Sequence, residues 1–212
     1  MIVTGAVAAY LQQLRPDPDP VLAEMEAQAA REGIPVVVPA TGQLLHVVAR
    51  ACGARRVLEV GTAIGVSTLD LARAVGEEGE VVSFEIDPDR YAVARECLNR
   101  AGVSGQTDLR LEDARLGVPT LEGEFDLAFV DGVKTQYGEY FEALLPLLRR
   151  GGVLAVDNVR MGGTVAEARG DGQWTQEQIE GARAFNQRLL RDESLTGTIV
   201  PVGDGVLMAV RL

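Results

Sequence analysis

Five short apolar runs recur along this chain, and helix-forming segments lie between them. The runs fall near residues 56–60, 81–85, 107–112, 125–130 and 153–156, and the helical patterns near residues 67–75, 88–101 and 136–149. Strands that alternate with helices in this way predict a parallel sheet with right-handed crossovers. A last pair of apolar runs, on either side of Gly203-Asp204-Gly205, predicts a terminal antiparallel hairpin. We therefore expect an α/β fold.

The first 51 residues lack such runs, and their pattern predicts helices. Asp19-Pro20 is typical of a helix start, Gly33 of its end, and a second helix is expected from Leu44 to Ala51. The first of these helices has an apolar stripe at positions 21, 22, 25 and 29. This stripe either packs over the helix from Leu44 in the same chain or needs a second copy of the chain, and we favour a homodimer.

The length and composition suit one enzyme domain. A chain of 212 residues that is 47% hydrophobic can bury one large core. We expect a single domain over residues 1–212, in which residues 1–51 form a helical N-terminal region and residues 52–212 form the core.

A glycine turn follows the first apolar run, with the spacing Glu59-x-Gly61-x-x-x-Gly65. It leads into a helix, so backbone N–H groups at the helix start can hold an anionic group. The turn lacks the G-x-G-x-x-G spacing of dinucleotide sites, which disfavours NAD. The next run ends at Glu85, where an acid can receive ribose hydroxyls. These features predict a nucleoside ligand without a pyrophosphate; the alternative is ordinary turn glycines and a solvated glutamate.

Oxygen-bearing side chains end two further runs. Asp131 follows the run at 125–130, and Asp157 and Asn158 follow the run at 153–156. If these strands are parallel neighbours, their carboxyl ends open into the same crevice. Oxygen ligands suit Mg²⁺, Mn²⁺ or Ca²⁺ better than zinc. The alternative is that both aspartates are helix caps or turn formers.

Charge and cysteine content restrict the class of partner and compartment. The net charge of −11 opposes loose binding to nucleic acid or to an anionic membrane. Cys52 and Cys97 match no paired ligand or redox spacing, so we expect them to be packing residues. The chain has no basic leader and no apolar run of membrane-spanning length, which predicts a cytoplasmic protein with no membrane partner.

Taken together, these segments resemble the class I S-adenosylmethionine (SAM)-dependent methyltransferases, and specifically the metal-dependent O-methyltransferases of catechol and caffeoyl-CoA type. The resemblance spans roughly residues 34–211, and Val-Asp131-Gly-Val-Lys134 with Val-Asp157-Asn158 is its most specific part. It implies a Rossmann-like fold with a seven-stranded, mostly parallel sheet, a C-terminal antiparallel hairpin and helices on both faces. It also implies a divalent cation on Asp131, Asp157 and Asn158, with Mg²⁺ expected first and Mn²⁺ or Ca²⁺ as alternatives.

The resemblance further implies roles for the residues around the cofactor. Lys134 matches the family lysine that is often assigned as general base. The positions implied to bind SAM are Glu59, Gly61, Thr62, Ser67, Glu85, Ile86, Asp131 and, at the adenine edge, Asp113 and Ala114. Of these, Gly61 and Ser67 are expected at the methionine end and Glu85 at the ribose. Glu59 is expected to order the glycine turn.

Three further residues bear on this pattern. Ala63 stands where many methyltransferases have a second glycine. His46, the lone histidine, is expected to be a surface or packing residue and not a base. Trp174 ends a glycine-rich loop that begins at Arg160, and it either caps an aromatic acceptor or packs at a dimer interface.

The methyl acceptor is less well defined by the sequence. A small aromatic vicinal diol fits because its two adjacent oxygens can chelate one cation. The alternative is 5-hydroxyuridine in tRNA, since the chain also resembles bacterial tRNA hydroxyuridine methyltransferases. The arginines at 149, 150, 160 and 169, expected near the metal loops, favour RNA, and the net charge opposes it. A third reading is a nucleoside-binding protein without catalysis. We favour the small aromatic acceptor.

Overall fold

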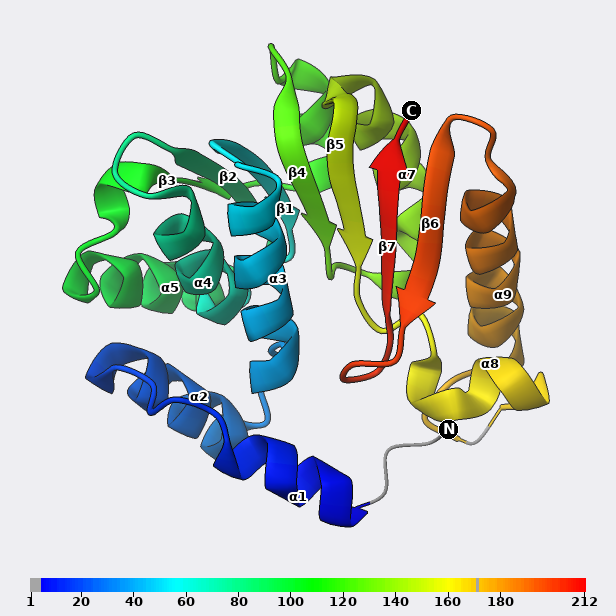
Figure 1. The fold of residues 1–212 in the computed structure, drawn as a ribbon, viewed down its shortest axis with the longest axis horizontal. Coiled ribbons are helices and arrows are strands. Elements are labelled where there is room, and N and C mark those ends of the chain that lie inside the picture. Colours follow the sequence, from blue (N-terminus) through cyan, green and yellow to red (C-terminus); the bar gives the residue numbers. More distant parts are fainter. Residues whose placement is uncertain (1–4, 171) are drawn as a thin grey trace.

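The computed structural model describes residues 5–170 and 172–212, and a seven-stranded sheet runs through the centre of this part of the chain (Figure 1). The strand order is β3-β2-β1-β4-β5-β7-β6. Strands β1 to β5 pair in parallel, and β7 pairs antiparallel with both β5 and β6. The strands are β1 Arg56–Val60, β2 Glu80–Glu85, β3 Thr107–Leu111, β4 Phe125–Val130, β5 Leu148–Val156, β6 Leu195–Val200 and β7 Val206–Arg211. The expected mostly parallel sheet with a C-terminal hairpin is confirmed.

Helices cover both faces of the sheet, as expected (Figure 1). Successive residues of a strand point to opposite faces, so Val57 of β1 packs into one apolar cluster and Leu58 into the other. The first cluster is completed by α2 Pro20–Glu32, α3 Pro39–Ala51, α4 Val66–Val75 and α5 Pro88–Arg100. The second is completed by α6 Ala114–Gly117, α7 Tyr137–Leu144 and α9 Gln176–Arg191.

Shorter helical turns connect these elements. They are α8 Thr164–Glu167 and the 3₁₀ turns η1 Ser104–Gln106, η2 Val118–Thr120, η3 Lys134–Gln136, η4 Leu145–Leu147 and η5 Met161–Gly163. Among the described residues, no helix is both long enough and apolar enough to cross a membrane.

Some predicted boundaries differ from the structure. The helix expected to begin at Leu44 begins at Pro39, because proline is well tolerated at the first helical position. The helix expected over residues 136–149 ends earlier, and β5 already begins at Leu148. Pro146 follows the end of α7 and cannot continue an α-helix without losing a backbone hydrogen bond. The long helix α9 ends at Arg191, and a capping box of Thr175 and Gln178 forms its start.

The apolar stripe of α2 is buried within its own chain, so it does not by itself require a second copy, and the homodimer stays a prediction. Leu22, Met25 and Ala29 are buried within the same chain, where α2 contacts α4 and α5. Asp19 fixes the start of the helix, since its carboxylate accepts the N–H of Val21 and an Arg73 guanidinium from α4. A group of exposed apolar side chains lies instead on and just after α1 Gly5–Gln13: Val7, Tyr10, Leu11 and Leu14.

Candidate active site

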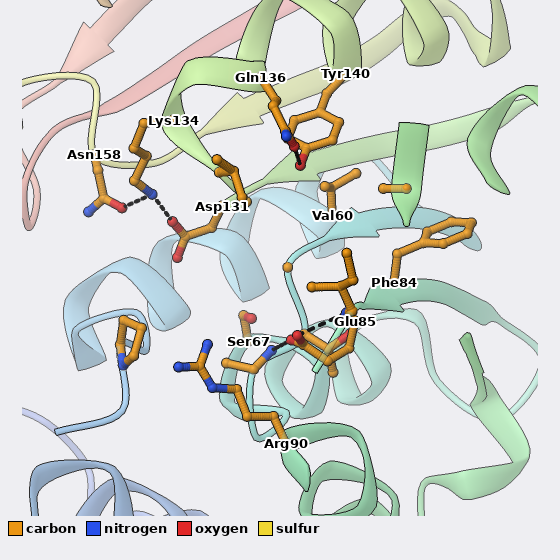
Figure 2. Close-up of a pocket in the computed structure, with 18 of the residues that line it drawn as sticks. Val60, Ser67, Phe84, Glu85, Arg90, Asp131, Lys134, Gln136, Tyr140 and Asn158 are labelled. Atoms are coloured by element: carbon orange, nitrogen blue, oxygen red, sulfur yellow. Dashed lines mark hydrogen bonds and ion pairs between the residues drawn. The ribbon is translucent and has the colours of Figure 1, made fainter. Parts of the chain in front are cut away.

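A cavity of about 590 Å³ opens at the carboxyl ends of β1, β2 and β4 (Figure 2). In a parallel sheet this edge is where ligands bind, and the strand order reverses direction along the chain between β1 and β4. All the sequence-predicted site residues line it except Glu59 and Asp157. The lining comes from residues within 35–37, 60–67, 84–90, 112–115 and 131–140, together with 158, 173, 174 and 204.

The glycine turn joins the two halves of the cavity. Gly61 has φ of 99°, and a Cβ atom at this position would lie 2.5 Å from the carbonyl oxygen of Asp131. A side chain therefore cannot be accommodated unless β1 and β4 separate. The N–H groups of Gly61 and Thr62 both donate to the Phe84 carbonyl at 3.1 Å, so the same turn is also tied to β2.

Glu59 lies beneath this turn and does not line the cavity. Its Oε2 accepts hydrogen bonds from the hydroxyls of Thr68 and Ser83, each at 2.5 Å. Ser83 also lies 2.6 Å from the Thr62 hydroxyl. Burial raises the pKa of the Glu59 carboxyl. The side chain therefore connects α4, β2 and the turn, which fits its expected role in ordering the turn.

Glu85 is the acid at the end of β2, and it lines the cavity although it is largely buried. Its Oε2 accepts the N–H of Ala63 at 2.6 Å, and its Oε1 accepts those of Ile86 and Asp87 at 2.9 Å. Each carboxylate oxygen has more than one acceptor site, so Oε2 can still accept a hydroxyl. Glu85 thus fixes the glycine turn and keeps capacity for a ligand.

Asp113 lines the cavity at the start of α6. Its carboxylate accepts the N–H of Arg115 at 2.9 Å and pairs with the Arg115 guanidinium at 2.6 Å. The hydrogen bond from this guanidinium lowers the pKa of the Asp113 carboxyl. Ala114, Ile86 and the largely buried Ser67 line the same cavity, so the predicted cofactor positions other than Glu59 come together.

The second end of the cavity is lined by two of the predicted metal ligands, Asp131 and Asn158, whereas Asp157 does not line it. The N–H of Asp131 donates to Val60 of β1, and that of Asp157 donates to Val130 of β4, so both residues extend the sheet ladder. Burial raises the pKa of Asp131. The pKa of Asp157 rises to about 7, first because of burial and then because of the nearby Asp131 charge. Two interacting carboxylates in a largely buried site are stabilised by a compensating cation or by protonation of one of them.

Lys134 supplies one positive charge at this position. Its Nζ donates to Asp131 Oδ1 at 2.6 Å and to Asn158 Oδ1 at 2.5 Å, as the dashed lines in Figure 2 show. Tyr137 holds the neighbouring strand end, since its buried hydroxyl donates to the Asp157 carbonyl at 3.0 Å. Asn158 has φ of 57°, a left-handed conformation that asparagine tolerates.

The side chains at this end fit a hard divalent cation. Two carboxylates and one amide oxygen are the ligand types that Mg²⁺, Mn²⁺ and Ca²⁺ prefer. Within the described residues, no cluster of three or more His, Cys, Asp or Glu side chains is suited to a metal ion. The predicted set contains only two acidic side chains and is completed by Asn158, and Asp157 itself is 2% exposed.

Several cavity residues had not been predicted. Asp204 lies in the β6–β7 turn, and its Oδ1 accepts the N–H of Gly162, which joins the hairpin to the loop after Asn158. The Gly-Asp-Gly motif marked this turn, but nothing in the motif indicates that it reaches the cavity. Arg90 and Arg115 also line the cavity. Trp174 lies at the cavity, the position expected for a residue that caps an acceptor.

The structure also gives the positions of the cysteines, the histidine and the arginines considered in the sequence. Cys52 and Cys97 are free cysteines, as expected for packing residues. His46 lies outside the cavity, and its Nδ1 is 3.0 Å from the Asp70 carbonyl oxygen. Arg149 and Arg150 were expected near the metal loops, and this is wrong. They lie near the start of β5, where Arg149 pairs with Asp126, whereas Asp157 follows the end of that strand.

Comparison with known proteins gives consistent matches. Residues 14–212 match a family model described as O-methyltransferase. A catechol O-methyltransferase of Niastella koreensis is 34% identical over 97% of this chain and 96% of its own length. A probable caffeoyl-CoA O-methyltransferase of Dictyostelium discoideum is 31% identical over 75% of this chain and 70% of its own. The crystal structure of the O-methyltransferase TomG from Streptomyces achromogenes in complex with SAM is 32% identical, with a TM-score of 0.86 over 97% of this chain and 96% of that one.

Proposed function

The chain belongs to the O-methyltransferase family and is a SAM-dependent O-methyltransferase; on that premise we propose that it methylates a small aromatic vicinal diol with the help of a divalent cation. One observation carries this proposal. Asp131, Asn158 and Lys134 meet at one end of a cavity whose other end holds Glu85, and the glycine turn joins the two ends. A methyl donor and a hydroxyl-bearing acceptor can therefore lie side by side.

The proposed cofactor position follows the backbone donors and acceptors of the first end. The start of α4, with Ser67, faces the methionine part of SAM, and the N–H groups there favour its carboxylate. Glu85 and Ile86 face the ribose, and Asp113 with Ala114 faces the adenine. Positioning of this kind lowers the barrier, because methyl transfer needs donor and acceptor in line.

We propose that Asp131, Asp157 and Asn158 hold the cation, with Mg²⁺ as the first expectation and Mn²⁺ or Ca²⁺ as alternatives. A bound divalent cation lowers the pKa of a coordinated hydroxyl and fixes its orientation. Lys134 lies within 2.6 Å of oxygens of Asp131 and Asn158, so an acceptor hydroxyl that reaches them also reaches its amine. Lys134 is thus the basic side chain placed to act on the hydroxyl proton.

Support for a small acceptor comes from the relatives and from charge. One relative is named as a catechol O-methyltransferase and another as a probable caffeoyl-CoA O-methyltransferase. The tRNA alternative loses support because Arg149 and Arg150 lie at the opposite end of β5 from Asp157. A net charge of −11 also opposes phosphate binding.

A labelled-SAM assay tests this proposal. The protein is given a panel of catechols and, in parallel, undermodified tRNA, each with Mg²⁺ and with EDTA. We expect methylation of at least one catechol with Mg²⁺ and little methylation in EDTA. Methylation of tRNA alone would refute the small acceptor, and full activity in EDTA would refute the role of the cation.

We also propose a homodimer in the cytoplasm. Tyr10 and Leu14 are 59% and 60% exposed, in a segment with few polar side chains, and such apolar surface commonly packs against a partner. Free Cys52 and Cys97 are compatible with a reducing compartment. Tyr10→Glu with Leu14→Glu should convert a dimer into a monomer and raise the acceptor KM, with SAM affinity unchanged. Light scattering that reports a monomer for the unaltered protein would contradict the dimer.

A further inference from the structure

The three basic side chains that line the described cavity differ in how they are paired. Arg115 lies 2.6 Å from Asp113, and Lys134 lies 2.6 Å from Asp131. Arg90 forms a looser ion pair, in which its Nε lies 3.9 Å from the carboxylate of Asp87. Arg90 is therefore the basic side chain of the cavity whose charge is least compensated by an acidic neighbour.

The local structure keeps Arg90 available. Asp87 caps the start of α5, and its Oδ1 accepts the N–H groups of both Asp89 and Arg90. This capping role holds the Asp87 carboxylate against the backbone. The Arg90 side chain is 40% exposed, and Figure 2 shows it extending from α5 into the cavity on the side of Ser67 and Glu85.

The charge of the cavity disfavours a ligand carboxylate that has no basic group beside it. Acidic side chains outnumber basic ones in the lining: Glu85, Glu112, Asp113, Asp131 and Asp204. SAM carries a carboxylate on its methionine part, and that carboxylate would meet this excess of negative charge. The N–H groups at the start of α4 offset part of the repulsion, and a guanidinium beside them can offset more.

We propose that Arg90 binds the methionine carboxylate of SAM and so makes the enzyme selective for a cofactor with an intact amino-acid part. The inference rests on the proposed placement of SAM, with its methionine part at the glycine turn and Ser67. It assigns to α5 a binding residue in addition to the groups of β1, α4 and β2. Because Arg90 is partly exposed, its contribution should weaken as the salt concentration rises.

The test compares two nucleosides that differ only at the amino-acid part. Calorimetry measures S-adenosylhomocysteine, which has the carboxylate, and 5′-methylthioadenosine, which lacks it. Arg90→Met should weaken S-adenosylhomocysteine by roughly fivefold to tenfold, as expected for a partly exposed charged contact. The same variant should change the binding of 5′-methylthioadenosine by less than about twofold. Arg90→Lys should restore part of the lost affinity.

Arg95→Met is the matched control, because Arg95 lies on the same helix, is exposed and faces the Tyr91 ring outside the cavity. It should leave both affinities unchanged. Equal weakening of both nucleosides by Arg90→Met, or no weakening of either, would overturn the inference. Glu85→Ala separates the two proposals, since it should weaken both nucleosides. If it weakens neither, the placement of SAM is wrong.

Discussion

The two ends of the cavity stabilise their carboxylates by different means. At the cofactor end, Glu85 accepts three backbone N–H groups, which are neutral and fixed by the fold. At the acceptor end, Asp157 accepts the N–H of Asn158 and lies close to the charge of Asp131. The first end is therefore organised by the main chain. The second depends on a cation, whether Lys134 or a bound metal ion.

This difference indicates which end responds to solution conditions. Backbone donors do not titrate, so the hydrogen-bond donors that hold Glu85 do not change with pH. The acceptor end contains buried carboxylates whose pKa values are raised, and its charge changes near neutral pH. Variants at the two ends should consequently separate cofactor binding from catalysis.

The largest effect is expected at the acceptor end. Asp157→Ala should lower turnover by about tenfold to a hundredfold, because it removes a charged ligand from the proposed metal site. SAM affinity should persist, since Asp157 does not line the cavity. Steady-state rates with Mg²⁺ and calorimetry with SAM measure the two quantities. Asp108→Asn on β3, outside the cavity, is the control, and parallel loss of both quantities would remove the distinction between the ends.

At the cofactor end, a substitution should instead weaken the binding of SAM. Glu85→Ala should weaken SAM binding by more than about tenfold, because a hydrogen bond to a charged group contributes roughly 1.5–3 kcal/mol. Glu85→Asp should lose less. The alanine variant also leaves the N–H of Ala63 without its acceptor, so its thermal stability should fall. An unchanged dissociation constant for SAM in calorimetry would mean that the ribose lies elsewhere.

Stability should also depend on pH through Asp157. Its pKa is about 7 in the folded protein and near 3.8 in the unfolded chain, so between these values the folded state binds the extra proton. The free energy of unfolding should therefore fall as pH rises from about 4 to about 7. A cation that binds the charged carboxylate should offset this loss. Thermal unfolding at pH 5 and pH 8 should show a larger stabilisation by Mg²⁺ at pH 8.

Two variants isolate this contribution. Asp157→Asn should abolish the difference between the two Mg²⁺ effects. Asp70, on α4 and next to Gly42 of α3, also has its pKa raised by burial, to about 6, and it does not line the cavity. Asp70→Asn should flatten part of the pH dependence but leave the Mg²⁺ effect intact. An Mg²⁺ stabilisation that is equal at both pH values in the unaltered protein would contradict the assignment.

The smallest effect is expected within the glycine turn. Ala63 has φ of 47°, a left-handed conformation that costs an ordinary residue about 1 kcal/mol. Ala63→Gly removes this cost but makes the unfolded chain more flexible, so the net stabilisation should be roughly 0.5 kcal/mol. Chemical denaturation with a linear extrapolation can measure such a change. A clear destabilisation would mean that the Ala63 methyl group contributes packing that exceeds its backbone cost.

The sequence predicted the elements that have a periodic or local signal. Strand alternation, the Asp19 cap and the Glu59-x-Gly61 turn each depend on neighbouring residues, and the structure contains all three. The position of Asp204 depends on how the C-terminal hairpin packs beside β5, which no local pattern describes. The predicted position of Arg149 was wrong because the strand was expected to begin near residue 153, whereas β5 begins at Leu148. Once the strand begins at Leu148, its first residues must lie at the far end of the sheet.

The missing Cβ of Gly61 has a consequence for altering this enzyme. The main chain of the glycine turn lies directly against the main chain of Asp131, so backbone contact sets the separation between the proposed methyl donor and the metal ligands. A side chain that lines the cavity without contacting this turn, such as Trp174, can therefore be exchanged without altering that separation. Gly61→Ala, in contrast, would lengthen the path that the methyl group travels for every acceptor alike.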